Sequence, residues 1–377
     1  MKKTLHLILA AAMTFNMAAK TAITTTPASD SRITYVGRTL TDGGDVTFDW
    51  TGTEIRLRFT GDRLDVTLSD TDLNYFNLWL DGPVTGEADK IIPSRGTDTT
   101  VTLITRADLT ARYGRKIPTE HTVILKKRTE GEQGKTTFHS FTTNGALLQA
   151  QPVRERIIEF IGDSYTCGYG SENSIATDPF KKETENQNKA YDAIVSRYFD
   201  ADHIVIAHSG MGISRNYNDK LKGYHMPDRY LNVFDDGYEQ NDATPRWDPN
   251  SFAHPDITVI FLGANDFSVS RQPSLAQFKA NYTRLLQTIK DFYGESHPIL
   301  CVATHNDPMI ATYVKAAVDE CNMKDVTYTA ITPYIRASDE LGASFHPNYT
   351  AQRKAAFQLI PYIATLTGWG LQDRPVE

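Results

Sequence analysis

The sequence predicts two domains of different fold class: an antiparallel β-sandwich of the jelly-roll type, followed by a three-layer α/β domain. Three observations lead to this prediction. Short runs in which apolar and polar residues alternate fill the chain before residue 150, and longer apolar runs separated by helical patterns follow it. The length of 377 residues also suits two domains, since an ordinary domain has about 100–200 residues.

The first domain is expected over residues 30–150, where the apolar pattern has a period of two. The runs with this pattern are 45–50, 54–59, 64–68, 75–80 and 121–125. Apolar side chains at every second position indicate strands that are buried on one face. Apart from a short helical turn near residues 106–112, no helical pattern is present here. The region therefore predicts an antiparallel β-sandwich.

The second domain is expected over residues 151–377. Apolar runs predict strands at 156–161, 203–207, 257–262, 299–303 and 326–331. Helical patterns lie at 190–199, 274–293, 309–321 and 349–366. Near-continuous apolar strands that alternate with helices are typical of a parallel sheet covered on both faces. Five such strands predict a flavodoxin-like three-layer sandwich.

Residues 1–22 have the features of a secretory signal peptide. Lys2 and Lys3 precede an apolar stretch, and small residues follow at Ala18, Ala19 and Ala22. No later stretch approaches the roughly 20 apolar residues that span a bilayer. We therefore expect export to the periplasm or the extracellular medium after cleavage, and no membrane span.

Charge and cysteine content narrow the classes of ligand. The formal net charge of −7 disfavours a nucleic-acid partner, which requires clustered Lys and Arg. The three cysteines, Cys167, Cys301 and Cys321, are too few for a disulfide scaffold, and their spacing is not that of a metal site. One bridge between Cys301 and Cys321 remains open, although free thiols are the simpler expectation. We expect a neutral or weakly charged ligand, and neither a metal nor another cofactor.

Residues suited to acyl transfer follow the ends of the predicted strands. Gly162-Asp163-Ser164 comes after the first strand, Gly210 after the second and Asn265 after the third, and His346 precedes the last helix. The carboxyl ends of parallel strands meet at one edge of a sheet, so these residues are expected to lie together.

Each of these residues has a chemical role to fill. Ser164 on a sharp strand-to-helix turn suits a nucleophile, and His346 suits its base. The N–H groups of Ser164 and Gly210 and the side-chain amide of Asn265 suit an oxyanion hole. Taken singly, each fragment is equally a turn, a loop cap or a surface histidine, but the four together are hard to obtain by accident.

Four segments of the chain resemble the four blocks of the SGNH (GDSL) hydrolase superfamily. They are Gly162-Asp163-Ser164, Gly210, Gly263-x-Asn265-Asp266 and His346. A β-sandwich that runs directly into such a domain is similar to carbohydrate esterase family two, and the resemblance covers roughly residues 33–370. It implies a serine esterase that removes O-acetyl groups from plant polysaccharides such as xylan or glucomannan. It also implies an acyl-enzyme on Ser164 and no cofactor.

The sequence departs from the superfamily at its histidine. The superfamily commonly places an Asp two or three residues earlier, where this chain has Ala343 and Ser344. A backbone carbonyl can hold the imidazole Nδ1–H instead, as the resemblance implies for some members, and we favour this arrangement. Asp339 or Glu340 is the alternative.

Three further polar residues are expected to have supporting roles. His208 ends a strand and is expected to be packed or to support the site. His254 precedes its strand and should lie at the opposite edge of the sheet. Asp266 is expected to stabilise the loop that carries Asn265.

Aromatic residues are candidates for contact with sugar rings, which stack on aromatic faces. Trp247 is the first candidate for such a platform, although a tryptophan that seals the domain is an equal interpretation. Tyr165, Phe267 and Phe345 flank the candidate catalytic residues and are expected to shape the acyl pocket. The β-sandwich is expected to pack against the hydrolase domain and to shape its cleft.

Two alternatives remain open. The absence of the usual Asp before His346 is also consistent with a secreted carbohydrate-binding protein that has a degenerate active site. The motifs are also consistent with a lipase or thioesterase of the same superfamily. The sequence predicts neither the hydroxyl that is deacetylated nor the oligomeric state.

Overall fold

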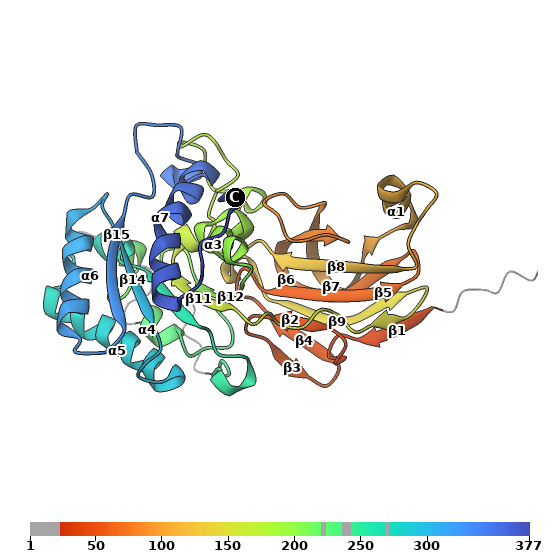
Figure 1. Cartoon of the computed structure of the whole chain (residues 1–377), viewed down its shortest axis with the longest axis horizontal. Helices are drawn as coiled ribbons and strands as arrows, with labels where there is room; N and C mark the ends of the chain where they lie inside the picture. Colours follow the sequence, from red (N-terminus) through yellow and green to blue (C-terminus); the bar gives the residue numbers. More distant parts are fainter. Residues whose placement is uncertain (1–22, 220–223, 236–242, 269–270) are drawn as a thin grey trace, which may run out of the picture.

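The structure, a computed structural model, describes residues 23–219, 224–235, 243–268 and 271–377. Two domains lie side by side along the long axis of the molecule (Figure 1). The predicted signal peptide, residues 1–22, lies outside the described residues.

The first domain is an antiparallel sheet of the order β10-β5-β8-β6-β9-β4-β3, to which β1 is added on β9, β2 on β5 and β7 on β6. Its strands are β1 (Thr24–Pro27), β2 (Thr34–Val36), β3 (Leu40–Asp42), β4 (Asp45–Phe48), β5 (Glu54–Thr60), β6 (Leu64–Leu80), β7 (Lys90–Ile104), β8 (Glu120–Lys127), β9 (Thr136–Thr143) and β10 (Leu147–Leu148). The helical turn expected after β7 is α1 (Arg106–Tyr113), which buries Leu109 in the core of the domain.

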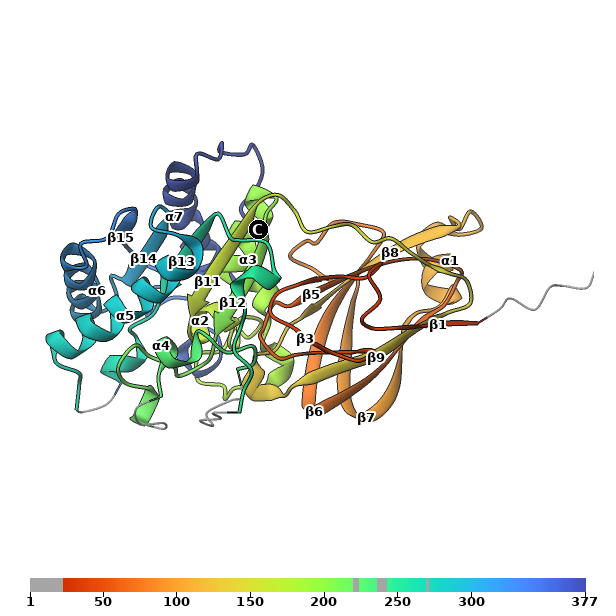
Figure 2. The same cartoon turned by 90° about the horizontal axis from the view of Figure 1, so that it is seen from below.

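The long strand β6 divides this sheet into two layers. One edge of β6 pairs with β7, and the two strands lie side by side in Figure 2. The other edge is shared, because residues 76–80 pair with β8 whereas residues 64–70 pair with β9. The β8 side and the β9 side therefore separate and enclose an apolar core. This confirms the predicted sandwich, but the runs expected as two strands at 64–68 and 75–80 form one.

The second domain has a five-stranded parallel sheet of the order β12-β11-β13-β14-β15. Its strands are β11 (Ile157–Gly162), β12 (Asp202–Ala207), β13 (Ile257–Phe261), β14 (Ile299–Thr304) and β15 (Val326–Ile331). Its longer helices are α3 (Tyr191–Phe199), α5 (Leu275–Tyr293), α6 (Pro308–Glu320) and α7 (Tyr349–Thr367), and α2 (Ser164–Cys167) and α4 (Met226–Arg229) are short. The strands and the longer helices begin and end within one residue of the predicted bounds.

Helices cover both faces of the parallel sheet, which makes three layers (Figures 1 and 2). On one face α5 and α6 pack against Ile161 and Ile260, and on the other α3 and α7 pack against Phe160 and Val259. Successive residues of a strand point to opposite faces, so two covered faces explain the continuous apolar runs. The chain reverses direction across the sheet at β11, so the switch point of the fold lies at the carboxyl ends of β11 and β13.

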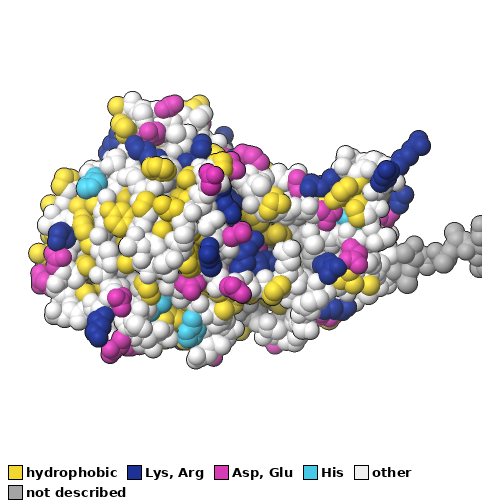
Figure 3. Space-filling view, viewed as in Figure 1, with side chains coloured by type: hydrophobic (Ala, Val, Ile, Leu, Met, Phe, Trp, Pro, Cys, Tyr) yellow, Lys and Arg dark blue, Asp and Glu magenta, His cyan; other side chains and the backbone are white. Residues whose placement is uncertain are grey.

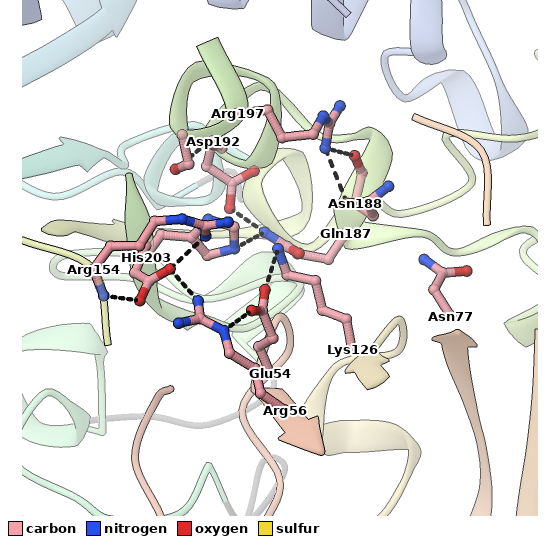
Figure 4. A network of polar contacts seen from close by, with 12 residues as sticks. Glu54, Arg56, Asn77, Lys126, Arg154, Gln187, Asn188, Asp192, Arg197 and His203 are labelled. Atoms are coloured by element: carbon pink, nitrogen blue, oxygen red, sulfur yellow. Dashed lines mark hydrogen bonds and ion pairs between the residues drawn. The ribbon is translucent and has the colours of Figure 1, made fainter. Parts of the chain in front are cut away.

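Buried charges cross the interface between the two domains (Figure 4). Arg56 of β5 is 2% exposed, lies 2.7 Å from a Glu54 oxygen through Nε, and donates to Asp202 at the start of β12. Arg154, in the segment that connects the domains, lies 2.6 Å from the same Asp202 oxygen. Burial lowers the pKa of Lys126, beside Glu54, to about 8. The second domain thus supplies one of the two carboxylates, Asp202 beside Glu54, that compensate the buried charge of Arg56.

The outer surface carries charges of both signs. On the face shown in Figure 3, Lys and Arg side chains gather beside acidic ones over the junction of the two domains. Within the described residues, no helix combines the length and the apolar character needed to cross a bilayer. Cys167, Cys301 and Cys321 are free thiols.

Replacing Asp202 with Ala is expected to lower the free energy of unfolding by about 3–5 kcal/mol, because it leaves Arg56 buried beside an incomplete set of partners. Urea unfolding measures this change. The control is Asp319→Ala, which removes an exposed partner of Lys315 and should cost less than about 0.5 kcal/mol. A loss for Asp202→Ala as small as that of the control would contradict the interface described above.

Candidate active site

Ser164 is the first residue of α2, directly after β11. Asp163 caps this helix, because its side chain accepts a hydrogen bond of 3.1 Å from the backbone N–H of Tyr165. The turn depends on Gly162, where a Cβ would lie 1.9 Å from Oγ1 of Thr166. The sharp turn therefore presents the Ser164 hydroxyl at the switch point of the sheet.

The imidazole of His346 lies beside this hydroxyl. Its Nε2 is 2.9 Å from Ser164 Oγ, and its Nδ1 is 3.1 Å from the carbonyl oxygen of Ser344. A carbonyl oxygen only accepts hydrogen bonds, so Nδ1 carries the proton and Nε2 is free to accept from the serine hydroxyl. The alternative orienting group, Glu340, instead accepts from the N–H of Ile335.

The loop that carries His346 is held in an unusual backbone conformation. Ser344 and Phe345 have positive φ angles of 52° and 62°, which residues with a side chain seldom adopt. The N–H of Ser344 donates to Asp178 (2.9 Å) and that of Phe345 to Ala176 (3.0 Å). These bonds maintain the strained turn, and the turn directs the Ser344 carbonyl at the imidazole.

Two aromatic rings shield part of the His346 ring from water. The ring of Tyr169 lies 4.3 Å from it, centroid to centroid, and that of Tyr165 lies 5.9 Å away edge-on. Burial lowers the pKa of His346 to about 4, and the carbonyl groups of Ser344 and Ala343 oppose this shift. The imidazole is therefore neutral at pH 7, as a general base must be.

Gly210 lies in a tight turn after β12. The N–H of Met211 donates to the carbonyl of His208 at 3.1 Å, and Gly210 has a φ of 83°, which is the third position of a type II turn. We call residues 208–211 the oxyanion turn, because they include Gly210, whose N–H is the predicted oxyanion donor. The next residues are held by Asp266, whose carboxylate accepts from the N–H groups of residues 213–215 at 2.6–2.9 Å.

Asn265 begins the short helix η6 (Asn265–Phe267) after β13. Its Nδ2 donates to the Met211 carbonyl at 2.9 Å and to Asp163 Oδ2 at 3.1 Å. The amide is thus tied to both the oxyanion turn and the residue before Ser164. Burial raises the pKa of Asp163 to about 7.

The four predicted residues line one cleft of about 950 Å³. Ser164, Gly210, Asn265 and His346 all contribute to its wall. The first domain contributes Asp72, Glu132 and Gln133, so both domains form the cleft. Within the described residues, no group of three or more His, Cys, Asp or Glu side chains is arranged to hold a metal ion.

Aromatic residues line the cleft, but only some are those expected. Tyr165 does so, and its hydroxyl lies 2.9 Å from that of Tyr334. Tyr169, Phe180 and Tyr217 also line the cleft. The first two were not predicted, and their rings stack at 4.2 Å. Tyr169 lies only five residues after Ser164, which is the one sequence signal that could have identified it.

Three of the predicted aromatic residues are not among those that line this cleft. Trp247 is 8% exposed and packs with Val233 and Phe234 in a separate cluster, so it seals the domain rather than lining the cleft. Phe267 packs against the core of the second domain. Phe345 is 61% exposed beside the catalytic loop and outside the cleft wall.

The histidine predictions agree with the structure. His208 is buried, and its Nδ1 lies 2.8 Å from Asp235. His254 lies at the amino end of β13, with its ring against that of Tyr293.

A serine hydroxyl bonded to an imidazole at the carboxyl edge of a parallel sheet defines a class of protein, the serine hydrolases with a three-layer α/β domain. Comparison with known families is more specific. Residues 35–152 match the family described as carbohydrate esterase 2 N-terminal, and residues 160–354 match the GDSL-like lipase/acylhydrolase family.

Relatives of known name share both domains. The chain is 30% identical over 331 residues to cellulase/esterase CelE of Acetivibrio thermocellus, covering 85% of this chain and 38% of that protein. It is 28% identical over 335 residues to an acetylxylan esterase/glucomannan deacetylase of Cellvibrio japonicus, covering 85% of this chain and 86% of that protein.

A solved structure gives the same result. A family two carbohydrate esterase from Clostridium thermocellum, in complex with cellohexaose, superposes with a TM-score of 0.78 at 28% identity and covers 90% of this chain and all of that one. The chain therefore belongs to the GDSL-like lipase/acylhydrolase family, and its two domains are those of the family two carbohydrate esterases.

We expect His346 to titrate with a midpoint near pH 4 in a histidine NMR titration, because burial disfavours the charged ring. Ester hydrolysis should stay on a plateau down to roughly pH 5 and fall below it, since a protonated ring cannot accept the serine proton. Tyr169→Ala exposes the ring, so both midpoints should move up toward about 6.5. A wild-type midpoint already at that ordinary value would contradict the shielding.

Proposed function

We propose that the protein is an exported serine esterase that removes O-acetyl groups from polysaccharides such as xylan or glucomannan. The observation that carries the proposal is the 2.9 Å contact between His346 Nε2 and Ser164 Oγ, in a cleft to which both domains contribute. The relative from Cellvibrio japonicus supports the substrate class by its name. The signal-like residues 1–22 support export.

The first half of the reaction transfers the acetyl group to Ser164. His346 Nε2 takes the hydroxyl proton while Oγ attacks the acetyl carbonyl, which forms a tetrahedral intermediate with a negatively charged oxygen. The intermediate collapses, the bond to the sugar oxygen breaks, and His346 returns its proton to that oxygen. The deacetylated sugar leaves and an acetyl-serine remains.

The second half releases acetate. A water molecule gives its proton to His346 and attacks the acetyl-serine, and collapse of the second intermediate restores the Ser164 hydroxyl. The Nδ1–H bond to the Ser344 carbonyl keeps the ring in one tautomer and one orientation through both halves. A carbonyl dipole can therefore do the orienting work of the missing carboxylate.

The oxyanion is stabilised by the N–H groups of Ser164 and Gly210 and by the Asn265 amide. The two N–H groups of the Asn265 amide already donate hydrogen bonds within the protein. The substrate oxygen therefore has to share one of these two donors. The contact to Asp163 is the longer, at 3.1 Å against 2.9 Å to Met211, so it is the one to be shared. Such preorganised donors act in a partly dry site, where they are strongest.

The shape of the cleft supports a short acyl group and a sugar leaving group. The bond between Tyr165 and Tyr334 fixes the tyrosine ring beside Ser164, so it cannot swing away to admit a long chain. The stacked rings of Tyr169 and Phe180 and the half-exposed Tyr217 offer flat faces to a sugar ring.

Replacing Ser164 with Ala is expected to abolish release of acetate from acetylated xylan or glucomannan, because it removes the hydroxyl that is bonded to His346 Nε2. Acetate is measured by NMR, and Ser251→Ala, at an exposed position in the short helix η5 (Pro249–Ser251), is the matched control. Turnover by Ser164→Ala would assign the chemistry to another residue. A wild type that binds cello-oligosaccharides but releases no acetate would favour a binding protein, and a preference for long-chain nitrophenyl esters would favour a lipase.

Replacing Asn265 with Ala is expected to lower kcat by about 10²–10³-fold with little change in KM, because the amide is used mainly in the transition state. Steady-state kinetics on nitrophenyl acetate checks this. An equal rise in KM with unchanged kcat would show that Asn265 binds the ground state instead.

A further inference from the structure

We propose that Glu130, a residue of the first domain, is a positioning residue that holds the oxyanion turn of the second domain. The machinery for acyl transfer is then complete only when both domains are present. This inference rests on the proposed function, because it assigns a support to the same oxyanion hole.

Glu130 reaches the oxyanion turn directly. It lies between β8 and the short helix η1 (Gly131–Gln133), and it is 0% exposed. Its Oε2 accepts a hydrogen bond of 2.6 Å from the backbone N–H of Ser209. Such a short bond from an N–H to a carboxyl oxygen, away from water, is among the stronger hydrogen bonds of a protein.

The Ser209 N–H that donates to Glu130 belongs to the peptide between His208 and Ser209. The next peptide along the chain carries the N–H that stabilises the oxyanion. Ser209 and Gly210 are the two central residues of the oxyanion turn, and the peptide between them carries the Gly210 N–H. Type I and type II turns differ by a flip of this central peptide. Glu130 anchors the N–H of Ser209, and Gly210 has a positive φ. Both features favour the orientation of the Ser209–Gly210 peptide in which the Gly210 N–H points into the cleft.

Neighbouring contacts hold Glu130 in place. The buried ammonium of Lys127 donates to the carbonyls of Thr129 (2.7 Å) and Glu130 (3.1 Å). The next residue, Gly131, approaches the second domain so closely that a Cβ would lie 2.4 Å from Cβ of Asp235. Asp235 in turn lies 2.8 Å from His208, the first residue of the oxyanion turn.

A second carboxyl group lies beside Glu130. Glu185 Oε2 accepts the backbone N–H of Glu130 at 3.2 Å. Burial and the nearby Glu130 raise the pKa of Glu185 well above its usual value. Burial and like-charge repulsion thus both disfavour two negative charges beneath the turn.

Two variants of similar length separate positioning from packing. Glu130→Gln keeps an oxygen that can accept from Ser209, whereas Glu130→Met fills the space without an acceptor. The matched control is Glu54→Gln, which alters another buried carboxylate of the first domain at the interface, beside Arg56 and Lys126 (Figure 4). Glu54 is not among the residues that line the cleft.

We expect Glu130→Met to lower kcat for nitrophenyl acetate by about 10- to 100-fold with KM within about twofold, because a donor displaced by a fraction of an ångström loses its effect in the transition state. Glu130→Gln should stay within about fivefold of wild type, since only the charge assistance is lost. Glu54→Gln should keep the wild-type kcat. Hydrogen exchange at Ser209 should accelerate in Glu130→Met alone.

Equal kcat in Glu130→Met and wild type, or equal losses in Glu130→Met and Glu54→Gln, would overturn the inference. Unchanged exchange at Ser209 would overturn it even if the wild type hydrolysed no ester, because that measurement needs no turnover. Failure of the proposed function is distinct, since it appears as a wild type without esterase activity.

Discussion

The hydrogen bond between the Nδ1 of His346 and the carbonyl of Ser344 is the interaction on which the rest of the site depends. It fixes the ring tautomer, so that Nε2 can accept the proton of Ser164 at 2.9 Å. A carbonyl has no net charge and cannot be protonated at moderate pH. Burial lowers the pKa of the ring, and the carbonyl opposes this shift only in part. The position of the carbonyl requires two residues at positive φ.

The two domains form one functional unit. The parallel sheet supplies the strand ends from which Ser164, Gly210 and Asn265 extend, and the sandwich supplies part of the cleft wall. Arg56 and Asp202 link the domains at one part of the interface, and Glu130 reaches the oxyanion turn at another. Buried charges of this kind tolerate little change in geometry, so they hold the domains in one relative orientation.

Much of the fold and the centre of the site could be predicted from the sequence. The parallel strands were found because both faces are buried, which makes them apolar throughout. The join between the two halves of β6 was not found, because residues 69–74 are polar apart from Leu73 and the pairing shifts register there. The sequence left two interpretations of Trp247 open, a sugar platform and a seal of the domain, because its packing against Val233 and Phe234 depends on contacts that no periodicity shows.

By itself the sequence determined the order of the two domains, the ends of the parallel strands, and the identity of the hydroxyl, the imidazole and the amide. These follow from local patterns and from the rule that parallel strands end at one edge. Only the tertiary structure decided which group orients His346, which aromatic rings face the cleft, and that a carboxyl group of the first domain supports the second. Those features depend on contacts between residues far apart in the chain. Every residue has a backbone carbonyl, so the sequence does not show which carbonyl orients His346.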